Sequence, residues 1–91
     1  MRKEEFKKLL QEYGDAVITY RSPNSNKVKY NVCTIDFNND YIKGKNNRAK
    51  EGDSTVLMFC WDTDAYRLMD PENVTSVVPL SSILKNEWNL P

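Results

Sequence analysis

The sequence predicts a mainly β protein, in which a small five-stranded barrel follows one N-terminal helix. Residues 2–13 show the apolar spacing of a helix, and residues 15–80 contain five short runs that are rich in β-branched and aromatic side chains. A tight turn and then a one-turn helix separate the last three runs, which is the order of elements expected at the end of a small barrel. Because 91 residues suffice for only one hydrophobic core, we expect a single domain, residues 1–91.

The N-terminal helix is predicted over residues 2–13. Apolar side chains from Phe6 to Tyr13 follow the i, i+3, i+4, i+7 spacing of one helical face. Gly14 comes next and suits the positive-φ position that ends many helices. A helix of this length is marginal when isolated in water, so we expect its apolar face to cover an open end of the barrel.

The first half of the barrel is predicted from two strands and a loop. Residues 16–21 are dense in strand-forming side chains, and residues 27–37 form a longer run. The more apolar face of this second run switches near Cys33, so we expect a bulge or a sharp bend there. Residues 41–42 are expected to stay extended, and residues 43–52, with four cations and two glycines, to form a mobile surface loop.

The second half of the barrel is predicted from residues 54–61, 65–69 and 74–80 as the third, fourth and fifth strands. Asp70 is a suitable N-cap and Pro71 occupies the first helical position, so residues 71–73 should form a 3₁₀ turn before the last strand.

The C-terminal segment, residues 81–91, begins with two serines that favour a short helix. Trp88 would then either plug the barrel or form an exposed contact, and we favour the plug.

Three segments carry a resemblance to a known family, namely residues 14–20, 27–34 and 61–67. They resemble a group of small, functionally uncharacterised bacteriophage proteins described as SH3 β-barrel fold-containing proteins, over residues 14–80. The resemblance implies an SH3-like barrel and a cytoplasmic accessory protein in an infected bacterium, and it implies no activity or functional residue. A fainter similarity to WYL-type ligand-sensing domains rests on residues 66–68, Asp70 and Val74.

Most catalytic and metal chemistry has no basis in this sequence. The chain contains no histidine, which removes the commonest general base, the Ser-His-Asp arrangement and nearly all zinc sites. Asp36 starts a calcium-loop pattern, but Tyr41 and Asn47 stand where that loop needs Gly and Glu. Asp62 and Asp64 indicate a solvated turn rather than a cation site. We therefore predict no enzyme activity, no catalytic residue, no metal site and no cofactor.

The surroundings of the protein are predicted from its ends and its cysteines. Cys33 and Cys60 belong to no paired motif, so we expect two buried, reduced thiols. The N-terminus lacks the apolar core of a signal peptide, and no apolar run approaches the roughly 20 residues that span a bilayer. We therefore expect a cytoplasmic protein without membrane contact, in the host cytoplasm if a phage encodes it.

The first functional hypothesis is a non-enzymatic protein-binding module with an unidentified protein partner. The tyrosines exceed what so small a core can wholly bury, and Tyr is a favoured contact residue. The expected aromatic contacts are Tyr20, Tyr30 and Tyr66.

The alternative is a nucleic-acid-binding barrel that uses the basic loop, residues 41–50. Tyr41 would stack on a base, and the cations Lys43, Lys45, Arg48 and Lys50 would each neutralise a phosphate. Against this, the net charge is zero. The charge is also uneven, since residues 1–50 hold eleven Lys and Arg against six Asp and Glu, and residues 51–91 hold two against seven. A virion component or a small-ligand sensor remains a further alternative.

Overall fold

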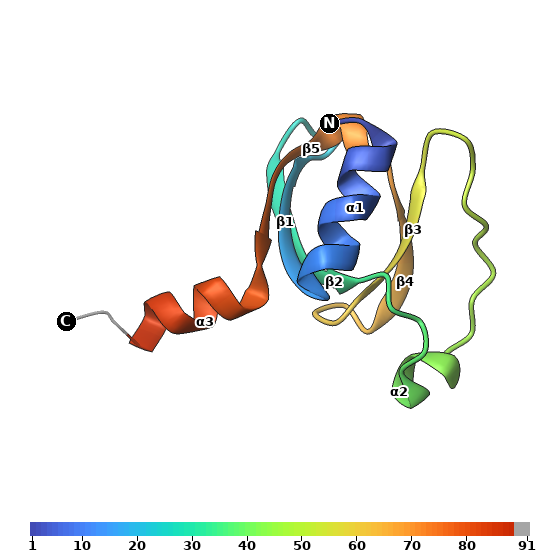
Figure 1. Cartoon of the computed structure of the whole chain (residues 1–91). Helices are drawn as coiled ribbons and strands as arrows, with labels where there is room; N and C mark the ends of the chain where they lie inside the picture. Colours follow the sequence, from blue (N-terminus) through green and yellow to red (C-terminus); the bar gives the residue numbers. More distant parts are fainter. Residues whose placement is uncertain (89–91) are drawn as a thin grey trace.

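The computed structural model describes residues 1–88 of the chain, and the side chains of residues 1–84 (Figure 1). One antiparallel sheet of five strands, in the order β4-β3-β2-β1-β5, curls around the helix α1. The elements are α1 (Lys3–Tyr13), β1 (Asp15–Arg21), β2 (Val28–Thr34), α2 (Asp40–Lys43), β3 (Val56–Cys60), β4 (Ala65–Met69), the 3₁₀ turn η1 (Pro71–Asn73), β5 (Val74–Pro79) and α3 (Leu80–Trp88). The predicted fold class, mainly β with an N-terminal helix, is confirmed.

The helix α1 packs its apolar face against the concave side of the curled sheet, whereas an open end of the barrel was its expected position (Figure 1). Its side chains Phe6 and Leu10 are fully buried and pack in one core with Ile18 of β1 and Met58 of β3. The helix ends at Gly14, whose φ of 75° is positive and whose backbone N–H donates to the carbonyl of Leu10 at 3.0 Å. Burial of this face supplies the stabilisation that so short a helix lacks on its own.

The sheet divides into two parts that share only the end of β2. β1 pairs with β2 along its whole length, from Asp15 opposite Thr34 to Arg21 opposite Val28. β2 pairs with β3 only where Cys33 lies opposite Cys60 and Thr34 opposite Phe59. The strands β5, β1 and β2 therefore form one part, the strands β3 and β4 form the other, and the first half of β2 has no partner on its β3 side.

The second strand differs from its prediction. It ends at Thr34 rather than at residue 37, and its pairing with β1 stays regular through Cys33, without the expected bulge. The register shift lies instead in β1, between Thr19 and Tyr20, opposite β5. No change of face is needed near Cys33, because Asn31 and Cys33 face the core while Val28 and Tyr30 are exposed.

The expected extended piece at residues 41–42 is wrong, because these residues form the helical turn α2. The side chain of Asn39 caps this turn by accepting the backbone N–H of Tyr41 at 2.9 Å. Ile42 is fully buried. α2 therefore packs through Ile42 while the chain around it stays at the surface.

The remaining predicted elements are present. The side chain of Asp70 caps η1, with Pro71 at its start. α3 begins after β5 and extends away from the sheet, and the side chain of Trp88 lies outside the described part of the structure (Figure 1). Cys33 and Cys60 are free and buried. Among the described residues, no helix is long and apolar enough to cross a membrane.

Candidate functional site

Tyr41 and Lys45, two of the five residues predicted to contact nucleic acid, are engaged within the molecule. The Lys45 Nζ donates to Asp64 Oδ2 at 2.8 Å and lies 4.6 Å from the centroid of the Tyr41 ring. The Tyr41 hydroxyl donates to Asp64 Oδ1 at 2.6 Å, and its ring stacks on Trp61 with a centroid distance of 6.2 Å. The hydrogen bonds from Lys45 and Tyr41 lower the pKa of Asp64, and the bond to Asp64 raises the pKa of Lys45.

The other three cations of this segment are exposed. Lys43, Arg48 and Lys50 form no ion pair within the described residues. Of these three cations, Arg48 lines a hollow of about 450 Å³, which is formed by residues 46–49 together with Ala65 and Tyr66. The structure thus brings Tyr41 and Lys45 together around one carboxylate and leaves the remaining cations spread along the loop.

The predicted aromatic contacts fall into three different environments. Tyr20 is 3% exposed and belongs to the core, so its prediction as a contact residue is wrong. Tyr66 is half-buried, because its ring packs edge-on against Phe59 and its hydroxyl donates to the carbonyl of Ile42 at 3.3 Å. Tyr30, in contrast, is 69% exposed. Of these three tyrosines, Tyr30 alone is mostly exposed to solvent.

Tyr30 belongs to a stretch of β2 whose backbone is open on one side. At one end of β2, the Trp61 N–H donates to the Val32 carbonyl at 2.7 Å, so the backbone of Val32 points towards β3. At the other end, the Ser22 N–H donates to the Lys27 carbonyl at 2.8 Å, so Lys27 points towards β1. Successive residues of a strand direct their N–H and C=O groups to alternate sides.

It follows from this alternation that the backbone groups of Val28 and Tyr30 point away from β1. No strand of the described structure pairs with them on that side. We call this side of residues 28–31 the β2 edge. An unpaired row of N–H and C=O groups is a ready template for another extended chain.

Where β2 and β3 separate, a carboxylate accepts the first backbone N–H of each strand that the other strand leaves unpaired. On β2, Asp62 accepts the Val32 N–H at 3.1 Å and the buried Asn31 Nδ2 at 2.9 Å. On β3, Glu51 Oε1 accepts the Leu57 N–H at 3.0 Å. These side chains satisfy the first donors beyond the paired region, and the groups of Val28 and Tyr30 have no such acceptor in the described part of the chain.

The Glu51 carboxylate is itself held by α1. Its Oε2 accepts a hydrogen bond from Lys7 Nζ at 2.9 Å and forms an ion pair with Lys3 at 3.4 Å. The bonds from Lys7 and from the Leu57 N–H lower the pKa of Glu51 to about 2. Glu51 therefore stays ionised at neutral pH.

Asp62 and Asp64 already accept protein donors, and the described residues contain no cluster of His, Cys, Asp or Glu that could hold a metal ion.

The two faces of β2 differ beside this edge. On the outer face, Val28 and Tyr30 are exposed, and Val32 continues the row beside Val17 of β1 and Val78 of β5. Lys27 and Lys29 alternate with these residues and therefore lie on the other face. The edge thus has an apolar side and a cationic side.

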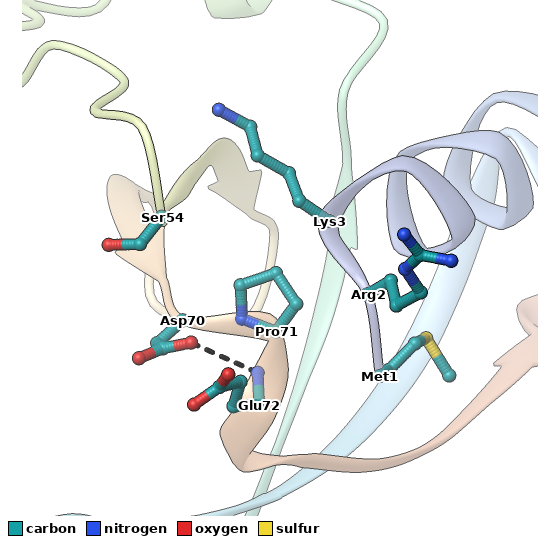
Figure 2. Close-up of a pocket in the computed structure, with 7 residues that line it drawn as sticks. All are labelled: Met1, Arg2, Lys3, Ser54, Asp70, Pro71 and Glu72. Carbon is teal, nitrogen blue, oxygen red and sulfur yellow. Dashed lines mark hydrogen bonds between the residues drawn. The ribbon is translucent and has the colours of Figure 1, made fainter.

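Figure 2 shows a small pocket at the start of α1, with a volume of about 180 Å³. It is lined by Met1, Arg2, Lys3, Ser54, Asp70, Pro71 and Glu72. Asp70 Oδ1 accepts the Glu72 N–H at 3.0 Å, and the Lys3 ammonium points away from the pocket and donates to the Gly52 carbonyl at 2.7 Å. These polar groups connect neighbouring elements, so this pocket is a weaker candidate site than the β2 edge.

Our sequence reasoning missed Lys27, Val28 and Lys29. Val28 and Tyr30 alternate with two lysines, and this pattern is typical of a strand whose apolar residues face the core and whose lysines face solvent. The alternation holds, but the apolar face is the exposed one. Nothing local in the sequence shows that β3 leaves β2 after two paired residues.

Comparison of the chain with protein-family models, with curated proteins and with solved structures gave no match.

Proposed function

We propose that this protein is a non-enzymatic protein-binding module that takes an extended segment of its partner along the β2 edge. The observation that carries this proposal is the pair of open backbone positions at Val28 and Tyr30, next to side chains that are 60% and 69% exposed. Strand addition of this kind draws affinity from main-chain hydrogen bonds and specificity from alternate side chains.

The apolar side of the edge supports binding of a protein segment. Val28, Tyr30 and Val32 form a row that continues across the sheet to Val17 and Val78. Contact of apolar side chains with such a row removes apolar surface from water. The resemblance to bacteriophage accessory proteins favours a host or phage protein in the bacterial cytoplasm as the partner.

A second candidate function is nucleic-acid binding by residues 43–50, favoured by the exposure of Lys43, Arg48 and Lys50. Replacing all three residues with Ala should then abolish a salt-sensitive mobility shift of DNA or RNA. Lys45 adds little to this surface, because its charge is already paired with Asp64.

The test of strand addition compares two substitutions at Tyr30. Tyr30→Pro removes the open N–H, and it breaks no hydrogen bond to β1 because that N–H points to the β2 edge. Tyr30→Val keeps the N–H and removes the ring. We expect a partner captured from bacterial lysate by the unchanged protein to be retained by Tyr30→Val with reduced affinity and lost with Tyr30→Pro.

Circular dichroism and thermal unfolding would establish that both variants are folded. A folded Tyr30→Pro variant that captures the same partner as strongly as the unchanged protein would contradict strand addition at this edge. Loss of the partner from the triple-alanine variant of Lys43, Arg48 and Lys50, with Tyr30→Pro unaffected, would favour the basic loop instead.

A further inference from the structure

We infer that the segment that pairs with the β2 edge is an acidic extended peptide, in which acidic residues alternate with apolar ones. This inference rests on the proposed function and names the chemistry of the partner. It is carried by the charge around the edge and by the difference between the two faces of β2.

The surroundings of the β2 edge hold more cations than carboxylates, although Asp62 accepts the Asn31 side chain at one end of the edge. Residues 16–31 contain Arg21, Lys27 and Lys29 and no Asp or Glu. None of these three cations forms an ion pair within the described residues. Across the strands, Lys29 lies opposite Tyr20, and the guanidinium of Arg67 lies 5.2 Å from the centre of the Tyr20 ring. Four positive charges therefore gather at this end of the sheet and exceed the negative charge of Asp62. This excess favours a negatively charged partner.

The alternation of the partner follows from the pleat. Side chains of a paired strand point to opposite faces in turn, and each lies beside residues on the same face of its neighbour. Every second side chain of an added segment would lie beside Val28 and Tyr30, where an apolar group fits. The side chains between them would lie on the face of Lys27 and Lys29, where a carboxylate fits.

Two other occupants suit the edge less well. A second copy of this chain, paired edge to edge, would bring its own Lys27 and Lys29 beside those of the first copy, and like charges on paired strands are destabilising. A nucleic acid would meet the cations, but it has no alternating N–H and C=O groups to pair with Val28 and Tyr30. An acidic peptide satisfies the backbone, the apolar face and the charge together.

The test uses designed peptides of about eight residues, the length of a long strand. One peptide alternates valine with glutamate, a second alternates valine with lysine, and a third has the composition of the first with all valines before all glutamates. Binding is measured by fluorescence anisotropy at about 50 mM and about 500 mM NaCl. We expect the valine–glutamate peptide to bind at least about tenfold more tightly than either comparator, and more weakly at high salt.

Charge reversal supplies the matched variants. Lys27→Glu combined with Lys29→Glu should transfer the preference to the valine–lysine peptide. Arg48→Glu combined with Lys50→Glu makes the same change of charge on the basic loop, and it should leave the preference unchanged. Tyr30→Pro should weaken binding of the valine–glutamate peptide by about tenfold or more, because main-chain pairing is lost.

The outcomes separate this inference from the proposed function. Equal binding of both alternating peptides, with loss in Tyr30→Pro, would support strand addition and overturn the acidic partner. Equal binding of the alternating and the blocked glutamate peptides would overturn the alternation. Failure of both alternating peptides to bind would overturn strand addition itself. Tighter binding of a single-stranded oligonucleotide, lost with Lys27→Glu and Lys29→Glu, would assign this surface to nucleic acid.

Discussion

Single carboxylates accept the hydrogen bonds of donors that are left unpaired between the two parts of the sheet. Asp62 satisfies donors of β2 and Glu51 satisfies a donor of β3, at the positions where the strands stop pairing. The Asn31 side chain is buried, and a buried N–H without an acceptor costs about 1–3 kcal/mol, so its bond to Asp62 offsets this cost where the strands separate. Of the two aspartates in the turn between β3 and β4, Asp62 accepts the backbone N–H of Val32, whereas Asp64 accepts the side chains of Tyr41 and Lys45.

At the residue scale, the charge of Glu51 should make stability depend on pH in acid. Its pKa in the folded protein is about 2, below its ordinary value of 4.5, so its charge stabilises the fold above about pH 4.5. That contribution is lost as the pH falls through about 2. Glu51→Gln keeps an acceptor for Leu57 and loses the pairs with Lys3 and Lys7. We expect it to lower the free energy of unfolding at pH 7 by about 1 kcal/mol, because solvent screens these pairs.

Urea unfolding at several pH values measures this effect. The difference between the unchanged protein and Glu51→Gln should shrink towards zero near pH 2. Asp53→Asn is the matched control, because it removes one negative charge from a nearby side chain that makes no hydrogen bond or ion pair in the described structure. It should change the free energy of unfolding by less than about 0.5 kcal/mol. A Glu51→Gln difference that persists unchanged at pH 2 would contradict this account of Glu51.

At the element scale, the geometry of β2 predicts an alternating pattern of amide hydrogen exchange. The N–H groups of Lys29 and Asn31 point to β1, where these residues lie opposite Tyr20 and Ile18. The N–H groups of Val28 and Tyr30 point to the open edge. We therefore expect the amides of Lys29 and Asn31 to exchange on the order of 100-fold more slowly than those of Val28 and Tyr30.

Nuclear magnetic resonance of the isotope-labelled chain measures this exchange residue by residue. The amide of Val32 should be protected although no strand accepts its N–H, because it donates to the side chain of Asp62. Asp62→Ala should then accelerate exchange at Val32 while Lys29 stays protected. Strong protection of Tyr30 in the free protein would mean that the edge is already covered, and it would contradict the proposed mode of binding.

Much of this element order could be predicted from the sequence, because local chemistry determines it. The fourth strand agrees with its predicted bounds, residues 65–69, and Asp70 and Pro71 identify η1 through its cap and its first position. The helical turn at residues 40–43 escaped prediction because four residues are too few to show the apolar spacing of a helical face.

The candidate site was less predictable than the elements that form it. Tyr20 and Tyr30 have the same side chain on paired strands, yet one is in the core and the other at the surface. Which of them is buried depends on the face of the sheet that α1 covers. The open edge depends on where β3 leaves β2, which is a property of the assembled sheet and of no single segment.

At the scale of the whole molecule, the two halves of the chain carry opposite net charges and therefore attract each other. Residues 1–50 carry a net charge of +5 and residues 51–91 a net charge of −5, from eleven minus six and two minus seven. Each ion pair of the described residues joins these halves, since Lys3 and Lys7 pair with Glu51, and Lys45 pairs with Asp64. The long loop between α2 and β3 is thereby attached near both of its ends.

This arrangement predicts that added salt destabilises the protein. Because the total charge is zero, salt relieves no overall repulsion and mainly screens the attraction between the halves. Raising NaCl from about 20 mM to about 500 mM should lower the urea midpoint of the unchanged protein. Glu51→Gln combined with Asp64→Asn should remove most of that salt response. Asp53→Asn combined with Glu72→Gln should preserve it, because this control makes the same change of charge at side chains without ion pairs among the described residues. An equal salt response in both double variants would show that these pairs contribute nothing to holding the halves together.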